Sequence, residues 1–384
     1  MRILLTNATL AHRTGSELYV VDLARALRAR GHDAVVYSPV LGELAGDLAA
    51  AGVTAVDALD GVVDPPDLIH GHHHAWTLTA LSYFPGVPGL FVCHGYEPWE
   101  EAPLLFPRLL RHVAVDLPTA ERLTAAGVPG ERVETILNFV DLDRFQPRPP
   151  LPQRPRRALV FSNNAHEGTY LPAVRNACAA AGIEVDVAGI ASGKIAVRPE
   201  RLLPAYDLVF AKARAAIEAL AVGAAVVLCD AAGCGPMVTS AELARLRPLN
   251  FGFRTLDQPL SVQALRDQIA RYDPADAALV CGRMRQEAGL DRAMALYLDL
   301  YERILAEHRT GAAATDPAAE GRATAAYLRW LDPFLRERGR ALIDRAALWR
   351  KVHALEDECE RLRGQAAHAS IPGRPPRREP ERFL

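Results

Sequence analysis

The sequence has 384 residues, half of them hydrophobic, and a formal net charge of -2 at pH 7. This length favours two domains, with enough apolar side chains to bury a sizeable core. The nearly balanced charge gives no electrostatic reason to expect a nucleic-acid partner. No apolar run is long enough to span a bilayer and no signal-peptide pattern precedes the first strand-like run, so we expect a cytoplasmic protein.

The first 146 residues alternate short apolar runs with helical patterns. Strands are predicted at residues 2–6, 34–37, 53–56, 67–70, 90–93, 113–115 and 133–137. Helices are predicted at residues 17–30, 43–51, 104–110 and 119–126. Such alternation is typical of a parallel sheet with helices on both faces, so we predict a Rossmann-like domain at residues 1–146.

Residues 147–157 hold five prolines and four arginines. Because proline removes a backbone donor and fixes φ, we interpret this segment as a linker. The alternation then restarts, with strands predicted at 158–161, 184–187, 208–210 and 225–228 and helices at 170–181, 215–222, 262–272 and 292–306. We predict a second Rossmann-like domain at 158–290 and, at 291–308, a helix that packs back on the body. Two such α/β domains would face a cleft, and ligands of such sheets bind outside the carboxyl ends of strands.

The last 75 residues differ in character. Residues 310–321 resemble a second linker, and a helical appendage is predicted at 322–365. Within it, apolar residues are spaced by four, three, four and three, at Leu348, Val352, Leu355, Cys359 and Leu362. This heptad seam leaves two interpretations open, an amphipathic helix that lies on the body and a helix that mediates self-association. The Pro- and Arg-rich residues 366–384 are predicted to be disordered.

Four histidines, His70, His72, His73 and His74, stand close together after the strand predicted at 67–70. A metal ion needs ligands that converge on one point, and neither an acidic residue nor a cysteine stands beside them. The six cysteines contain no CxxC pair, so we expect no zinc site and no disulfide framework. We interpret His70 and His72 as the carboxyl end of a strand near the cleft, and His73 and His74 as a helix entry or plain surface.

A dinucleotide-binding dehydrogenase would share this architecture. Its first strand should lead into G-x-G-x-x-G, whereas this chain continues as TNATLAHRTGSEL, with only Gly15 before the helix. The missing glycines disfavour an NAD-dependent oxidoreductase.

Five motifs occur in one order along residues 1–305. They are TGSE at 14–17 with RGH at 30–32, DLIHGH at 67–72, HG at 94–95, NFVDLDRFQP at 138–147 and EALAVGAAV at 218–226. Together they make the chain resemble GT-B glycosyltransferases, specifically those of glycosyltransferase family 4. The resemblance implies two Rossmann-like domains that transfer a sugar from a nucleotide-diphosphate sugar to an acceptor. It also implies retention of anomeric configuration, without a metal or another cofactor.

For the donor, the resemblance implies that Glu218 accepts hydrogen bonds from the ribose hydroxyls. The donor phosphates would meet the loop at Gly15, the helix start with Lys212 and Arg214, and a glycine-rich turn with Gly233 and Gly235. Simpler interpretations stay open, since Glu218 also suits a helix start, the two cations also suit a solvated loop, and the glycines also suit an ordinary turn.

For catalysis, the resemblance implies His94 and Glu17, which both follow predicted strands of the first domain. A structural histidine and a helix-start carboxylate are the alternatives for these two residues. His70, His72 and Asn138 would shape the acceptor side. The acceptor is a glycan, a lipid-linked molecule or a small molecule, and transient contact with a membrane surface stays open.

The chain departs from the family pattern at two points. Phe210 stands eight positions before Glu218, where the family carries a glutamate that meets the sugar, and Pro236-Met237 replaces the glutamate after the glycine turn. A catalytically degenerate subunit that acts in assembly or binding is therefore the alternative to an active enzyme.

Overall fold

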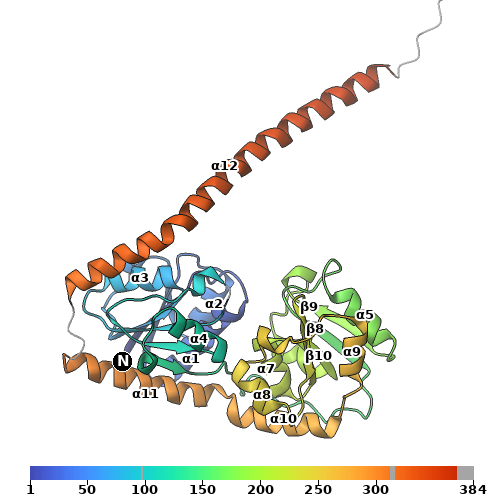
Figure 1. Ribbon diagram of the computed structural model, residues 1–384, viewed down its shortest axis with the longest axis horizontal. Coiled ribbons are helices and arrows are strands. Elements are labelled where there is room, and N and C mark those ends of the chain that lie inside the picture. Colours follow the sequence, from blue (N-terminus) through green and yellow to red (C-terminus); the bar gives the residue numbers. More distant parts are fainter. Residues whose placement is uncertain (97, 312–315, 370–384) are drawn as a thin grey trace, which may run out of the picture. The chain divides into compact units, whose positions relative to one another are not determined.

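The computed structural model describes residues 1–96, 98–311 and 316–369. The chain divides into a compact unit, Met1–Glu320, and a second unit that begins at Gly321. The compact unit contains two β-sheets with their helices, which Figure 1 shows in the colours of the sequence. This arrangement confirms the predicted fold class of two Rossmann-like α/β domains.

The first sheet contains seven parallel strands in the order β3-β2-β1-β4-β5-β6-β7. The strands are β1 (Arg2–Thr6), β2 (Asp33–Tyr37), β3 (Thr54–Val56), β4 (Leu68–His72), β5 (Gly89–Cys93), β6 (Leu109–Ala114) and β7 (Val133–Thr135). β4 and β5 are buried along their whole length because helices cover both faces of the sheet. The strand order reverses between β1 and β4, which makes the carboxyl end of β1 a place where such folds bind ligands.

Four helices flank this sheet, α1 (Gly15–Ala29), α2 (Glu43–Ala50), α3 (His74–Tyr83) and α4 (Leu117–Ala125). The apolar stripe of α1 packs on the sheet, with Val20, Leu23 and Leu27 buried. The helix predicted at 104–110 is wrong. Residues 102–106 have no regular structure and β6 begins at Leu109, because Pro103 and Pro107 lack the backbone donors that a helix needs.

The second sheet has the order β12-β11-β10-β8-β9, parallel except for the pair β11 and β12. Its strands are β8 (Arg157–Phe161), β9 (Glu184–Ala188), β10 (Leu208–Ala211), β11 (Ala225–Asp230) and β12 (Gly233–Met237). The helices around it are α5 (Leu171–Ala179), α6 (Pro199–Leu202), α7 (Ala213–Val222), α8 (Leu243–Leu246), α9 (Val262–Ile269) and α10 (Pro274–Glu287). Here the order reverses between β8 and β10.

α11 (Leu290–Arg309) returns from the second sheet to the core of the first domain. Its buried face includes Tyr297 and Tyr301, and the hydroxyl oxygens of Tyr297 and Tyr19 lie 2.6 Å apart. The helix therefore ties the carboxyl end of the second domain to the first sheet by both apolar packing and hydrogen bonds.

α12 (Pro317–Ala369) is one helix that begins inside the linker predicted at 310–321 and continues through the predicted appendage. Pro317 takes the first helical position, where proline is tolerated, and alanines follow it. Of the tail predicted at 366–384, residues 370–384 lie outside the described residues. Within the described part of the chain, no helix combines the length and apolar character that crossing a bilayer requires.

Candidate active site

A cavity of about 280 Å³ lies where the carboxyl ends of β1, β8, β9 and β10 meet. It is lined by residues at the ends of these strands, in the loops after them and in the helices that follow, namely Arg13, Thr14, Gly15, Leu18, Phe161, Ser162, Asn163, Asn164, Gly189, Ile195, Ala196, Pro199, Lys212, Ala213, Arg214, Ala215 and Glu218. Both sheets reverse their strand order beside this cavity, which is where α/β folds bind ligands. Four predicted donor residues, Gly15, Lys212, Arg214 and Glu218, line the cavity together.

The starts of α1 and α7 both border the cavity, at Gly15 and Ala213. The first backbone N–H groups of a helix have no partner inside it and carry partial positive charge, so they favour an anionic ligand. Ala213 adopts φ +50°, the left-handed region that costs a residue with a Cβ atom, while its own N–H donates to Phe251 O at 2.8 Å. The backbone is thus bent sharply at the point where the chain leaves β10 for α7.

Lys212 contributes a cation to the same cavity. Its ammonium group pairs with the buried carboxylate of Asp230, and the side chain keeps 35% of its surface exposed. The lysine is therefore held in place by Asp230 and still reaches the cavity, as a group that contacts phosphate must.

Arg214 was predicted to bind the donor phosphates, but its guanidinium group already pairs with two carboxylates of the protein. Its Nη2 pairs with Asp22 of α1, and its Nε donates to Glu218 Oε1 at 2.8 Å. The side chain is only 12% exposed, so its charge is neutralised inside the protein and not offered to a diphosphate. We correct its role accordingly, from a phosphate ligand to a residue that positions Glu218.

Glu218 itself keeps one oxygen available. Oε1 accepts the bond from Arg214, and no hydrogen bond among the described residues reaches Oε2. Burial raises the pKa of Glu218 above its usual value, with Arg214 acting in the opposite direction. Glu218 is the only acidic side chain among the residues that line the cavity, so it is the carboxylate that can accept hydrogen bonds from a ligand there.

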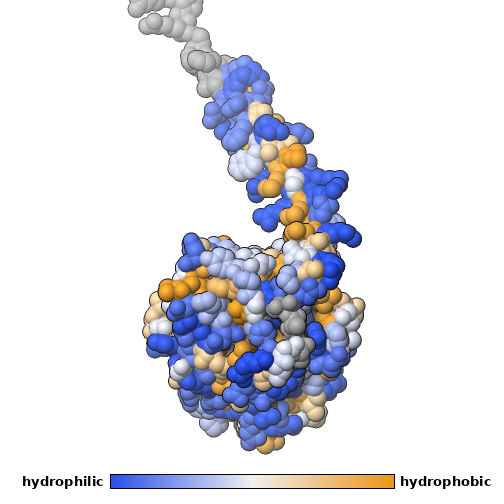
Figure 2. All heavy atoms as spheres, turned by 90° about the vertical axis from the view of Figure 1, so that its left-hand side faces the viewer, coloured by the Kyte–Doolittle hydropathy of each residue, from blue (hydrophilic) through white to orange (hydrophobic). Residues whose placement is uncertain are grey.

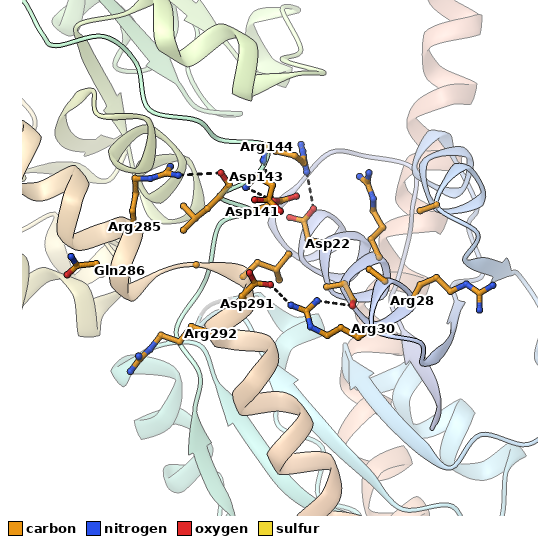
Figure 3. Close-up of a pocket in the computed structure, with 17 residues that line it drawn as sticks. Asp22, Arg28, Arg30, Asp141, Asp143, Arg144, Arg285, Gln286, Asp291 and Arg292 are labelled. Atoms are coloured by element: carbon orange, nitrogen blue, oxygen red, sulfur yellow. Dashed lines mark hydrogen bonds and ion pairs between the residues drawn. The ribbon is translucent and has the colours of Figure 1, made fainter.

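Asp22 connects this cavity to a second one of about 580 Å³, which it lines (Figure 3). Its Oδ1 accepts from Arg144 Nη1 at 3.0 Å, and Oδ2 accepts from Arg214. Arg144 also pairs with Glu200 at 3.3 Å. The Asp22 carboxylate of the first domain is thus shared between Arg214 of α7 and Arg144, which follows β7 in the sequence.

The predicted acceptor-side histidines lie elsewhere than expected. The rings of His70, His72 and His94 form a stack, with centroid distances of 4.6 and 4.9 Å. His70 Nδ1 lies 2.6 Å from Tyr301 Oη, and His72 Nδ1 lies 2.6 Å from His94 Nε2. Burial lowers the pKa of His70 to about 3 and that of His94 to about 4, so the stack is uncharged at neutral pH.

His70 and His72 are fully buried, so neither of them faces an acceptor. Residues two apart on a strand share a face, which is why these two rings align instead of pointing several ways. His94 is partly exposed but does not line the cavity. In the described residues no group of three His, Cys, Asp or Glu side chains is arranged to hold a metal ion.

His73 and His74 form the entry to α3, and the alternative of a plain surface is wrong because both are buried. His73 has φ +61°, and its Nε2 lies 3.2 Å from Glu101 Oε1. Glu101 Oε2 in turn accepts from the backbone N–H of His94 at 2.7 Å. Burial raises the pKa of Glu101, but the hydrogen bonds from His73 and from the backbone N–H of His94 contribute in the opposite direction, and the pKa lies below its usual value.

Gly233 and Gly235 do not form the expected turn. They belong to β12, which pairs antiparallel with β11, and both are buried. A Cβ atom would lie 2.8 Å from Gln258 O at Gly233 and 2.3 Å from Thr255 O at Gly235. These glycines are needed for close packing of the protein's own backbone, and they leave no room for a phosphate.

Glu17 and Asn138 also lie outside the cavity lining. Glu17 is buried in the first turn of α1, where its carboxylate accepts from Thr14 Oγ1 and from Ser16 Oγ at 3.2 Å. Asn138 accepts a hydrogen bond from Arg247 at its backbone oxygen, at 2.7 Å. The geometry of Glu17 is that of a helix-start carboxylate.

The sequence predictions missed several residues of the site. Ser162, Asn163 and Asn164 directly follow β8, so their position at a strand's carboxyl end was a usable signal. Arg13 and Thr14 stand next to the predicted Gly15. Asp22 and Glu101 have no such signal, because their partners Arg214 and His73 lie on other elements of the fold.

In comparison with known proteins, the chain is similar to glycosyltransferases. Residues 13–144 match the model of Glycosyltransferase Family 4. None of the curated proteins matches the chain in sequence. A glycosyltransferase from Rickettsia africae superposes with a TM-score of 0.59 at 14% identity, over 79% of this chain and 98% of that one.

Two further structures show the same fold. Anabaena HepE in complex with UDP and glucose has a TM-score of 0.58 at 16% identity, over 79% of this chain and 99% of that one. Sucrose-phosphate synthase from Thermosynechococcus elongatus has a TM-score of 0.56 at 15% identity, also over 79% and 99%. The chain therefore has the GT-B fold, and its residues 13–144 match the model of glycosyltransferase family 4.

Proposed function

We propose that the protein is a glycosyltransferase that takes its sugar from a nucleotide-diphosphate donor bound in the 280 Å³ cavity. One observation carries this proposal. The N-terminal ends of α1 and α7 border the cavity together with Lys212 and Glu218, beside the strands at which both sheets reverse their order. A diphosphate needs positive charge and free N–H groups, whereas a ribose needs an acceptor for its hydroxyls. The family match and the fold support this function, and the UDP in the HepE complex supports a uridine nucleotide as the first donor to test.

The chemistry needs stabilisation of a leaving diphosphate that gains negative charge as the sugar leaves. Lys212 and the N-terminal ends of α1 and α7 lie where they can supply it, because fixed dipoles and cations act strongly in a site that excludes water. Glu218 Oε2 is available for the ribose hydroxyls. His94 is an uncharged imidazole at neutral pH, so it would act as a hydrogen-bonding group and not as a cation.

The finer features rest on the family resemblance. We propose a retaining transfer that needs no metal ion, with a glycan, lipid-linked molecule or small molecule as the acceptor. The cytoplasmic location and the transient membrane contact stay predictions.

Binding of the donor tests the site directly. Isothermal titration of UDP and GDP into the wild-type protein and Glu218→Gln should show a Kd about tenfold to a hundredfold higher in the variant, since a hydrogen bond to a charged group contributes roughly 1.5–3 kcal/mol. Glu218→Ala should weaken binding at least as much. Glu307→Ala is the matched control, because this glutamate of α11 pairs with Arg111 outside the cavity. An unchanged Kd in a folded Glu218→Gln protein would refute the site.

Turnover is tested separately, with a panel of nucleotide sugars assayed for hydrolysis or transfer. Phe210 lies buried in β10, so the position that carries a sugar-contacting glutamate in the family holds a core side chain. Activity with any donor would exclude the degenerate subunit. Nucleotide binding without turnover of any donor would instead support that alternative.

A further inference from the structure

The continuity of α12 extends the heptad frame beyond the seam that the sequence shows at residues 348–362. Because the helix runs unbroken from Pro317 to Ala369, one heptad frame extends from Tyr327 to Leu362. Alternating steps of four and three residues select Tyr327, Leu331, Phe334, Arg338, Ala341, Arg345, Leu348, Val352, Leu355, Cys359 and Leu362. With Leu348 at position d and Val352 at position a, the frame covers five heptads, about 54 Å of helix, and all of its d positions and three of its five a positions are hydrophobic.

The C-terminal half of the apolar seam faces water in a single helix. Leu348, Val352, Leu355 and Leu362 are between 44% and 64% exposed. Hydrophobic side chains gather along α12 in Figure 2, between hydrophilic ones. Pro333 takes position c, so its side chain lies outside the seam, and the helix continues on both sides of it.

The charges beside the seam fit a second copy of the same helix in parallel. In a parallel pair, position g of one helix faces position e of the next heptad on the other. These positions pair Lys351 with Glu356 and Glu358 with Arg363, so both pairs have opposite charge. The frame also contains two arginines at position a, Arg338 and Arg345. Each follows an acidic residue at position g, Glu337 and Asp344 respectively, which the facing helix presents to that arginine.

We propose that α12 is a dimerisation helix and that two copies of this chain associate through a parallel, in-register coiled coil over residues 327–362. Each seam leucine then packs against its counterpart, and both arginine layers receive a carboxylate from the partner. The two copies carry one GT-B unit each, so the proposal is independent of which donor or acceptor the enzyme uses.

Sedimentation velocity of the full chain tests the dimer. The wild type should sediment as twice its 41.7 kDa mass, and Leu348→Glu/Leu355→Glu should sediment as a monomer. Ile343→Glu is the matched control, because Ile343 is an equally exposed apolar residue at position f, opposite the seam. A monomeric wild type, a dimer that survives the seam variant, or equal loss in the control would overturn the proposal. The melting temperature of each variant shows that the GT-B unit stays folded.

Charge reversal and cross-linking test the orientation. Lys351→Glu should weaken the dimer at least tenfold by facing Glu356, and Lys351→Glu/Glu356→Lys should restore it. Cys359 at position a should form an interchain disulfide when diamide takes up the two electrons and two protons of the facing thiols, and Cys359→Ser should not. A dimer without this cross-link would overturn the parallel register. Binding to anionic phosphatidylglycerol vesicles that Ile343→Glu abolishes, in a protein that stays monomeric, would instead identify α12 as a membrane-surface helix.

Discussion

Replacing Arg214 by methionine tests the interpretation of the buried ion network beside the cavity. Arg214 pairs with Asp22 and Glu218, and the three side chains are 12%, 2% and 4% exposed. Methionine has a similar length without the charge. It leaves Asp22 with Arg144 and Glu218 with no ion partner among the described residues.

The expected loss of stability is large and depends on pH. Removing one partner of a buried ion pair costs roughly 3–5 kcal/mol. At 2–4 °C per kcal/mol, the melting temperature should fall by about 6–20 °C at pH 8. Burial and the charge of Asp22 already raise the pKa of Glu218, and the loss of Arg214 raises it further. Since the unfolded carboxyl titrates near pH ~4.3, the variant loses stability as pH rises from that value through the raised folded pKa, and its deficit should be smallest near pH 5.

Differential scanning calorimetry at pH 5 and pH 8 measures both effects. Arg25→Met is the control, because Arg25 lies exposed on α1, lines the second cavity and makes no ion pair among the described residues, so a change within about 0.5 kcal/mol is expected. Arg214→Met/Glu218→Gln should recover part of the loss. A variant that melts within about 2 °C of wild type at pH 8, or whose deficit is equal at both pH values, would refute the reasoning.

Three further predictions concern the cavity and the histidine stack. Lys212→Met should raise the Kd for UDP about tenfold or more in calorimetric titration, whereas Lys351→Met on α12 should leave it unchanged. Gly189→Ala should abolish UDP binding and lower the melting temperature, because a Cβ atom there would lie 1.9 Å from Ser162 O. Gly193→Ala is the control, since Gly193 has φ +70° and no neighbour within 4 Å of such an atom. It should lower the free energy of unfolding by only about 1 kcal/mol and keep UDP binding. Wild type should lose about 2 kcal/mol for a fully buried histidine such as His70 between pH 7 and pH 5, because the unfolded side chain takes up a proton that the folded one, with its lowered pKa, does not bind. His70→Asn should show a shallower fall in melting temperature over this range, and an unchanged slope would contradict that account.

Much of the fold could be predicted because it depends on local patterns. Runs such as ILL in β1 and GLFVC in β5 are apolar, as strands buried on both faces must be, and the stripe of Val20, Leu23 and Leu27 has the period of a helix. The helix predicted at 104–110 failed because apolar content outweighed the two prolines. The predicted boundary between linker and appendage at residue 321 failed because the alanines of residues 318–326 suit a helix as well as a linker.

The residues of the site likewise fall into two groups, those that local sequence patterns predict and those whose contacts depend on distant segments. The sequence alone determined that Gly15 and Lys212 stand at helix starts and that Glu218 lies in the helix that follows Lys212, since each lies next to its own structural signal. Only the tertiary structure decided what Arg214 does, because its partner Asp22 is 192 residues away. It likewise placed His72 against His94 and the glycines of β12 against backbone oxygens. Periodicity shows which side of a helix or strand is buried. The residues that it contacts on that side depend on how distant segments of the chain pack together in the tertiary structure.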